Sequence, residues 1–119
     1  MTENNKPVVD LVEYYLSRAE IFYTKGKVNE AIQSAETALN LCRSHPHVER
    51  EIALKLFIAR AKSHQGLYEE SNKIYRSLID EKVYLPPIML GILHNNLNLK
   101  QGEKVKNNVH LMRIWTGWF

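Results

Sequence analysis

Apolar residues recur every three or four positions through most of this chain, which is the spacing of an amphipathic α-helix. The first stripe predicts a helix over about residues 9–25, and the second predicts a helix over about residues 28–43. The stripes consist of Leu11, Tyr15, Ala19 and Phe22, and of Val28, Ala31, Ile32, Ala35, Ala38, Leu39 and Cys42. Because the second helix carries alanines where the first carries rings, the two should pack closely as an antiparallel pair.

The third predicted helix, over about residues 48–65, is apolar on two sides. One side carries Ile52, Leu56, Ala59 and Ser63, and another carries Phe57 and Ala61. Pro46 cannot lie inside a helix, so it separates this helix from the second. A helix that is apolar on two sides is expected between two neighbours, as in the middle of a helical array.

Three more helices complete the pattern. The fourth follows Gly66, the fifth opens at Pro86 and Pro87, where proline is tolerated in a first turn, and the sixth begins near Val105. Their apolar positions are Leu67, Ile74, Tyr75, Leu78 and Ile79, then Ile88, Ile92, Leu93 and Leu97, then Val105, Val109, Met112 and Trp115. No segment alternates clearly with a period of two, so no strand is expected.

Glycine marks the turns. Gly26, Gly66 and Gly102 each follow one apolar stripe and precede another, at intervals of 40 and 36 residues. Such a glycine accepts the left-handed conformation that ends a helix, and a 34-residue helix–turn–helix repeat with a few extra loop residues gives this spacing. The sequence therefore predicts one domain of three antiparallel hairpins. The hairpins span about residues 9–43, 48–81 and 86–115, within a domain over residues 9–116, between a flexible N-terminus (1–8) and a tail (117–119).

The first hairpin resembles a tetratricopeptide repeat (TPR). Its matches are Tyr15, Ala19, Phe22, Gly26, Ala31, Ala35, Ala38 and Leu39, and those of the second hairpin are Ala59, Gly66, Ser71, Tyr75, Leu78 and Ile79. The second departs from the pattern at Lys55 and Lys62, where large apolar residues are usual. The third has Gly91 in place of a large residue and Asn107 in place of a small one. The resemblance implies an all-α, right-handed TPR-like solenoid of six helices that binds proteins and is not an enzyme.

A narrower resemblance, over about residues 10–103, is to the N-terminal region of anaphase-promoting complex subunit 7. It is carried by a TPR with a widened loop, the segment 51–55, the proline-opened helix at 87–93 and the segment 100–103. This resemblance implies a scaffold and self-association role in a ubiquitin ligase of cell-cycle control. The alternative is a TPR adaptor in another assembly.

Composition narrows the classes of partner. The 119 residues carry a net charge of +3 with basic and acidic residues interleaved, so nucleic-acid binding is not expected. The N-terminus has no apolar signal region and carries Glu3, and no apolar stretch approaches the roughly 18 residues of a membrane span. The one cysteine, Cys42, cannot form an intramolecular disulfide, which favours a reducing compartment, the cytoplasm or the nucleus.

Candidate chemistry is sparse. Cys42, His45 and His47 could ligate a metal, but a structural zinc site needs four ligands and no fourth Cys or His lies nearby, so no metal or cofactor is expected. A Cys/His metal-dependent regulator is the alternative, and it would contain stoichiometric zinc. His64 and His94 fall on the first helices of the second and third hairpins, and we interpret them as surface side chains, with a shared groove as the alternative.

In TPR proteins the first helices of successive repeats line a groove. By repeat position, the groove here would present Glu13, Leu16, Glu20, Tyr23, Leu56, Arg60, Ser63, Ile92, Asn96 and Leu99. Co-chaperone TPRs grip a carboxylate-ended peptide with a lysine and an asparagine where this chain has Leu16 and Glu20. Because Glu20 would repel a carboxylate held at that position, a chaperone-tail clamp is not expected. The expected partners are protein helices or peptides, and self-association is a further expectation.

The aromatic C-terminal residues Trp115, Trp118 and Phe119 form a second candidate surface, an edge after Gly102. A solenoid needs a polar terminal cap to stay soluble. These residues therefore fold back on the last hairpin, dock on a partner, or mark a chain truncated from a longer repeat protein.

Overall fold

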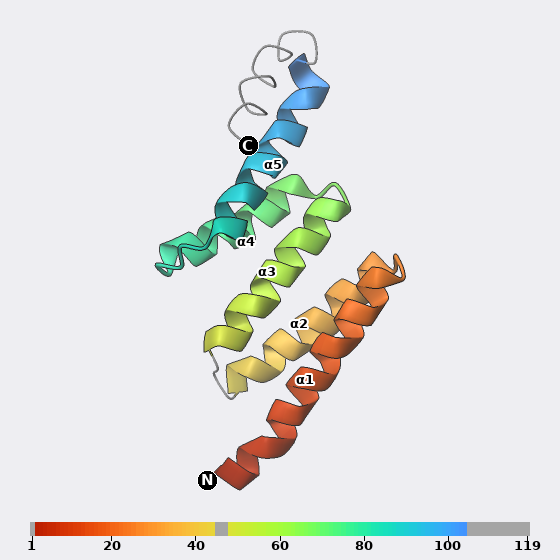
Figure 1. Cartoon of the computed structure of the whole chain (residues 1–119), viewed down its shortest axis with the longest axis vertical. Helices are drawn as coiled ribbons and strands as arrows, with labels where there is room; N and C mark the ends of the chain where they lie inside the picture. Colours follow the sequence, from red (N-terminus) through yellow and green to blue (C-terminus); the bar gives the residue numbers. More distant parts are fainter. Residues whose placement is uncertain (1, 45–47, 105–119) are drawn as a thin grey trace.

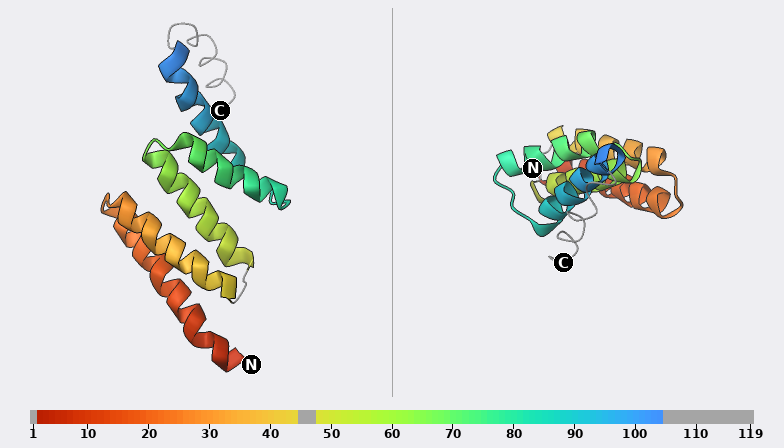
Figure 2. Two further views of the ribbon diagram at one scale, coloured as in Figure 1. Left: turned by 180° about the vertical axis from the view of Figure 1, so that it is seen from behind. Right: turned by 90° about the horizontal axis from the view of Figure 1, so that it is seen from above.

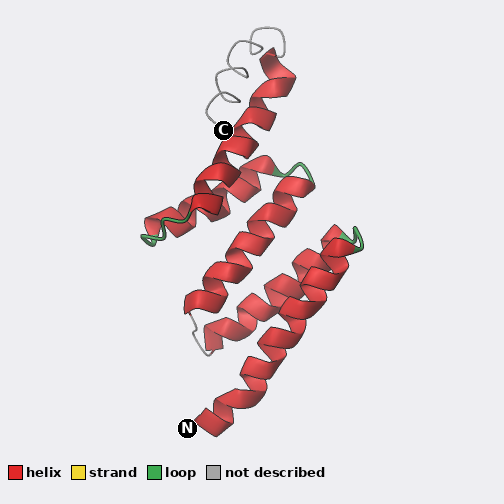
Figure 3. Ribbon diagram, viewed as in Figure 1, coloured by secondary structure: helices red, strands yellow, loops and turns green. Residues whose placement is uncertain are grey.

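The computed structural model describes the backbone of residues 2–44 and 48–104 and the side chains of residues 11–44 and 48–100. Within these residues the chain forms five α-helices and no strand, which confirms the expected all-α class (Figures 1 and 3). The helices are α1 (Thr2–Thr24), α2 (Val28–Ser44), α3 (Val48–His64), α4 (Tyr68–Asp80) and α5 (Pro86–Lys104). The sixth predicted helix, the pair His45 and His47, and the edge residues Trp115, Trp118 and Phe119 lie outside the described residues.

Successive helices run in opposite directions, and each packs mainly on its neighbours in the sequence (Figure 1). Figure 2 shows the same stacking from behind and from above. The molecule measures 58 × 32 × 20 Å, and its radius of gyration is 16.7 Å. A compact chain of this length would have a radius of gyration of roughly 13.5 Å. The helices therefore form an elongated stack.

Two clusters of buried side chains hold the stack together, and α3 contributes to both. The first cluster, between α1, α2 and α3, contains Val12, Ala19, Ala31, Ile32, Ala35, Ala38, Cys42, Leu54, Phe57, Ile58 and Ala61. The second cluster, between α3, α4 and α5, contains Ala59, Tyr75, Leu78 and Ile88. The prediction that the third helix is covered on two sides is confirmed.

The alanines of α2 allow its close packing on α1. Ala31, Ala35 and Ala38 are completely buried, as the small-against-large pattern predicts. The apolar stripe of α1 is shifted at its start, because Val12 is 3% exposed whereas Leu11 is 44% exposed. The sequence does not decide which of two neighbouring apolar residues, Leu11 or Val12, faces the core. Both lie near the same edge of the stripe, because neighbouring residues are about 100° apart around the helix.

The helices α1 and α3 end in the same kind of turn. Gly26 and Gly66 have φ angles of +80° and +84°, in the left-handed region that disfavours residues with a Cβ. After Gly26, the Lys27 N–H donates to the Phe22 carbonyl at 2.9 Å, which is the six-residue bond of a Schellman motif. The predicted role of these two glycines as helix terminators is confirmed.

Two helix boundaries differ from the prediction. The helix α5 passes through Gly102 and continues to Lys104, so this glycine does not end it. A glycine permits a left-handed ending without imposing one, and inside a helix it costs only about 1 kcal/mol relative to alanine. The helix α1 begins at Thr2 instead of about residue 9, because an apolar stripe marks the packed part of a helix and not its full length.

The departures from the TPR pattern have local partners. Lys55 Nζ lies 3.0 Å from Glu81 Oε1, and Lys62 Nζ lies 3.5 Å from Glu70 Oε1, so both lysines of α3 pair with carboxylates on or next to α4. Gly91 in α5 lies against the ring of Tyr75, where a Cβ would be 2.4 Å from the ring atom Cε2. A large residue at position 91 could not coexist with Tyr75 in its present position.

Candidate functional site

A cleft of about 710 Å³ opens between α1, α3 and the first half of α5, with one residue contributed by α4. The helices α1, α3 and α5 run in the same direction in Figure 1 and begin the three predicted hairpins. The cleft is lined by Leu16, Glu20, Tyr23, Ala53, Leu56, Phe57, Arg60, Ser63, His64, Tyr75, Pro87, Leu90, Gly91 and His94. Apolar and aromatic side chains dominate, with a few charged and polar groups among them, which is the usual composition of a recognition site.

One wall of the cleft is an aromatic cluster that joins α1 to α3. The ring centroid of Tyr23 lies 5.5 Å from that of Phe57 and 5.6 Å from that of His64, both in edge-to-face arrangements. The Tyr23 hydroxyl lies 3.4 Å from His64 Nδ1. Because edge-to-face pairs stabilise by about 0.5–1.5 kcal/mol each, this wall is formed before any ligand binds.

A guanidinium group lies on the same wall. The Arg60 guanidinium carbon is 5.2 Å from the ring centroid of Tyr23 and 5.9 Å from that of Phe57. Both distances are within the range of cation–π attraction. The rings hold the charge of Arg60 at the cleft while its side chain remains exposed to solvent.

Tyr75 of α4 and Gly91 of α5 also contribute to the lining. Tyr75 is 5% exposed, and burial raises the pKa of its hydroxyl, an effect that the charge of Arg60 partly opposes. The hydroxyl is therefore neutral near pH 7 and can donate or accept a hydrogen bond. On α5, His94 packs edge-to-face on Tyr68 with 6.3 Å between the ring centroids.

Six of the ten predicted groove residues line the cleft: Leu16, Glu20, Tyr23, Leu56, Arg60 and Ser63. The other four do not line it. Glu13 pairs with Arg50, Asn96 accepts a hydrogen bond of 3.0 Å from Asn72, Ile92 packs on the second cluster, and Leu99 lies further along α5. Ile92, Asn96 and Leu99 lie on α5, which packs more on α4 than on α3, whereas Glu13 lies on α1 and is held in its ion pair with Arg50.

Several cleft residues were not among those predicted from repeat positions: Ala53, Phe57, His64, Tyr75, Pro87, Leu90, Gly91 and His94. His64 and His94 are exposed, and both also line the cleft. Tyr75 lies on a second helix of a hairpin, which the repeat rule excludes from a groove. Its contact with Gly91 brings it there, and the unusual glycine was the one sequence signal that could have indicated it.

A second hollow, of about 430 Å³, lies between α2, α3 and α4. Its cationic lining includes Lys55 and Lys62, whose charges are already paired with Glu81 and Glu70. The cleft between α1, α3 and α5 is larger and carries the aromatic wall. It is therefore the stronger candidate for recognition.

The metal hypothesis centred on Cys42 gains no support from the described side chains. Cys42 is 2% exposed in the first cluster, and desolvation, followed by the charge of Glu51, raises the pKa of its thiol. A neutral, buried thiol is a poor nucleophile and a poor ligand. Among residues 11–44 and 48–100, no group of three or more His, Cys, Asp or Glu side chains is placed to hold a metal ion.

Comparison with known proteins adds no assignment. No model of a protein family, no curated protein and no solved structure matches the chain. Among the described helices, none is long and apolar enough to cross a membrane.

Proposed function

We propose that this chain is a non-catalytic, TPR-like interaction module whose cleft binds a segment of another protein. The observation that carries the proposal is the cleft itself, in which α1, α3 and α5 bring aromatic and aliphatic side chains to one surface. Tyrosine and arginine are enriched among the residues that contribute most to protein binding, and Tyr23 and Arg60 lie together here.

The exposed apolar area around the cleft supports the proposal. Leu90, which lines the cleft, is 49% exposed, and Leu16 and Leu56 of the lining are partly exposed. Exposed apolar side chains gathered in one cleft are typical of binding sites. The cleft volume of about 710 Å³ accommodates a few large side chains of a peptide, within the usual range for a ligand pocket.

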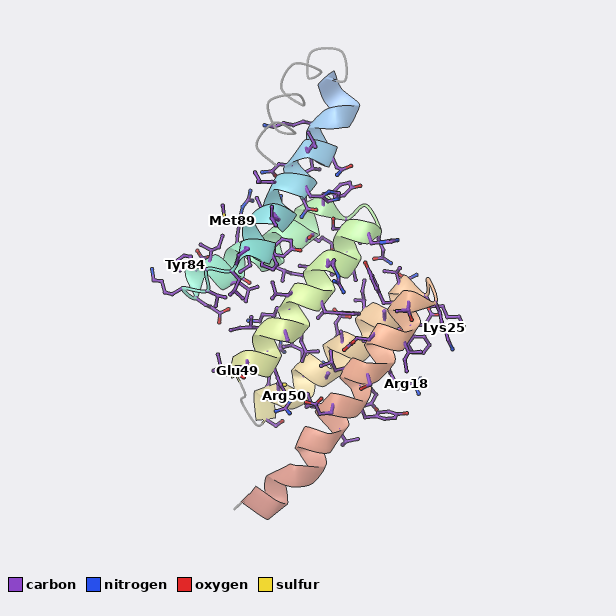
Figure 4. All side chains as sticks on the ribbon, viewed as in Figure 1. Arg18, Lys25, Glu49, Arg50, Tyr84 and Met89 are labelled. Carbon is purple, nitrogen blue, oxygen red and sulfur yellow. The ribbon has the colours of Figure 1, made fainter. Side chains whose placement is uncertain are left out.

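The test uses two neighbouring residues of α5. Leu90→Asp places a charge in the cleft, whereas Met89→Asp places the same charge on a similarly exposed side chain that does not line it. Met89 is labelled in Figure 4. Immobilised wild-type chain and both variants are incubated with cell extract, and retained proteins are quantified by mass spectrometry. We expect Leu90→Asp to reduce specific partners on the order of tenfold, and Met89→Asp to retain them. Equal retention by both variants, with unchanged circular dichroism, would reject the cleft as the binding site.

We further propose that the assembly is the anaphase-promoting complex, with the module serving as a scaffold subunit that also self-associates. The resemblance of residues 10–103 to the N-terminal region of its subunit 7 supports this narrower proposal. The same pull-down tests this narrower proposal, because other subunits of that ligase should be among the proteins retained by the wild-type chain. Their absence, together with a different reproducible set of partners, would favour a TPR adaptor in another assembly.

A further inference from the structure

We infer that the cleft recognises a peptide segment in which a carboxylate lies next to large apolar side chains, and that Arg60 is the residue that binds this carboxylate. The inference rests on the proposed function and names the chemistry of its partner.

The position of Arg60 is fixed by aromatic rings and not by a charge. Its guanidinium lies within cation–π distance of Tyr23 of α1 and Phe57 of α3, two rings that pack on each other, so both rings favour its position at the cleft. A guanidinium group stacked on rings keeps its N–H donors in its own plane, where they remain available for a second partner. Planar, bidentate binding of a carboxylate is the interaction for which this geometry is suited.

The other cationic residues of α3 all have carboxylate partners. Arg50 pairs with Glu13, Lys55 with Glu81 and Lys62 with Glu70. In the part of the chain whose side chains are described, no carboxylate lies within ion-pair distance of Arg60, and no hydrogen bond involves its guanidinium. Arg60 therefore differs from the other cationic residues of α3: it lines the cleft, and no carboxylate of the described residues neutralises its charge. Charge complementarity then favours an anionic group on the ligand.

Apolar side chains line the same cleft as Arg60. Leu16, Leu56 and Leu90 come from three different helices, and each is partly exposed. A free small anion would leave this apolar surface in contact with water. A peptide that carries leucine, phenylalanine or tryptophan beside an aspartate or glutamate covers the apolar surface and satisfies Arg60 at the same time.

Glu20 sets the orientation of such a peptide. It lines the cleft from α1 and does not pair with Arg60. A ligand carboxylate is therefore favoured on the α3 side of the cleft and disfavoured near α1. A basic residue of the ligand is favoured near Glu20, so the two cleft charges specify a direction of binding.

Arg18 provides a matched control for Arg60. Its guanidinium also lies over two rings, 5.6 Å from the centroid of Tyr14 and 5.2 Å from that of Phe22, but it is not part of the cleft (Figure 4). Replacement of either arginine by methionine keeps an apolar stem and removes the charge. Any effect specific to Arg60→Met therefore reports on the cleft and not on the general loss of a stacked cation.

The experiment selects a displayed library of random 12-residue peptides on the immobilised full chain and measures the Kd of synthetic copies of the selected peptides. We expect aspartate or glutamate at a fixed spacing from large apolar residues. Arg60→Met should weaken binding roughly 10- to 100-fold, the size of a lost charged hydrogen-bonded pair, whereas Arg18→Met should leave it unchanged. Replacement of the peptide's aspartate or glutamate by asparagine or glutamine should weaken its binding to the wild-type chain by a similar factor. The same replacement should change the affinity for the Arg60→Met variant little, because the partner of the carboxylate is already absent.

Different outcomes separate this inference from the proposed function. Peptides that lose affinity with Leu90→Asp, but lack acidic residues and bind Arg60→Met normally, would overturn the role of Arg60 and leave the binding cleft in place. Peptides insensitive to Leu90→Asp would overturn both. If sedimentation shows that the wild-type chain dimerises and that Arg60→Met is monomeric, the occupant is a second copy of this chain, and the inference of a separate peptide partner fails.

Discussion

Individual contacts around Tyr75 show how closely the cleft depends on single residues. Tyr75 is almost completely buried, lies against the backbone of Gly91, and contributes to the second cluster as well as to the cleft lining. A glycine at position 91 is needed because the ring occupies the space where a Cβ would be. The contact fixes the approach of α5 to α4 and so the width of the cleft.

Gly91→Ala should lower the free energy of unfolding by about 1–2 kcal/mol, because the clash with Tyr75 exceeds the gain in helix propensity. Urea denaturation measures the change. In a Tyr75→Leu background the ring is absent, so the same substitution should be neutral or stabilising. An equal loss in both backgrounds would show that the ring is not the cause.

At the scale of elements, the turns that end α1, α3 and α4 differ in the residue at their left-handed position. The turn after α4 has the same Schellman bond as the turns after α1 and α3, with the Val83 N–H donating to the Leu78 carbonyl at 2.9 Å. Its left-handed position is occupied by Lys82, with φ of +67°, where the other two turns have glycine. A side chain in this conformation costs about 1–2 kcal/mol.

Lys82→Gly should therefore raise the free energy of unfolding by up to about 1 kcal/mol, after the greater flexibility of glycine in the unfolded chain is subtracted. Thermal and urea denaturation both measure the gain. Gly66→Ala provides the reverse case and should reduce stability by about 1 kcal/mol. A loss of stability in Lys82→Gly would contradict the assignment of strain to this turn.

A buried polar network joins three of the elements. Ser71 Oγ donates to the Ala59 carbonyl at 2.7 Å, and Asn95 Nδ2 donates to Ser71 Oγ and Asn72 Oδ1, each at 2.9 Å. Asn95 is completely buried. The network runs from α3 through α4 to α5, so it helps to fix the relative positions of these three helices, all of which contribute to the cleft lining together with α1.

Asn95→Ala should cost about 2–3 kcal/mol of stability, because it removes buried hydrogen bonds and leaves Asn72 Oδ1 without this donor. The change is measured by urea denaturation. Asn98→Ala serves as the comparison, since Asn98 donates to the His94 carbonyl within its own helix and should cost less than about 1 kcal/mol. Similar losses for the two variants would mean that the network does not stabilise the stack.

At the scale of the whole molecule, stability is distributed along an array. Each helix packs mainly on its sequence neighbours, and α3 is covered on both sides by the two clusters. In such a linear arrangement the ends open more readily than the centre, because a terminal helix loses contacts on one side only.

Hydrogen exchange monitored by mass spectrometry or NMR should therefore show the slowest amides in α3. Peptides from the start of α1 and from the second half of α5 should exchange roughly ten times faster or more. This ratio of exchange rates should decrease under conditions where all amides exchange by global unfolding, because every helix then opens in the same event. Slower exchange in α1 or α5 than in α3 would contradict the linear distribution of stability.

The sequence by itself determined the all-α class and most of the helix boundaries. The spacing of apolar residues and the glycines at 26 and 66 located α2 and α3 within a residue or two, and Pro86 located the start of α5. These features are local: helix hydrogen bonds join residues four apart, and a left-handed turn depends on the residue that occupies it. For the same reason the alanines of α2 were identified as packing positions before any partner was known.

Only the tertiary structure decided which side chains meet. Glu13 is a predicted groove residue that pairs with Arg50, whereas Tyr75 lines the cleft although it is not among the residues predicted from repeat position. Lys55 and Lys62 depart from the repeat pattern, but each pairs with a carboxylate on α4 or directly after it. The register and angle at which helices pack depend on the combined fit of many side chains distant in sequence, so a periodic pattern on one helix does not specify them. The uncompensated charge of Arg60 belongs to this level, because its position follows from rings on two helices.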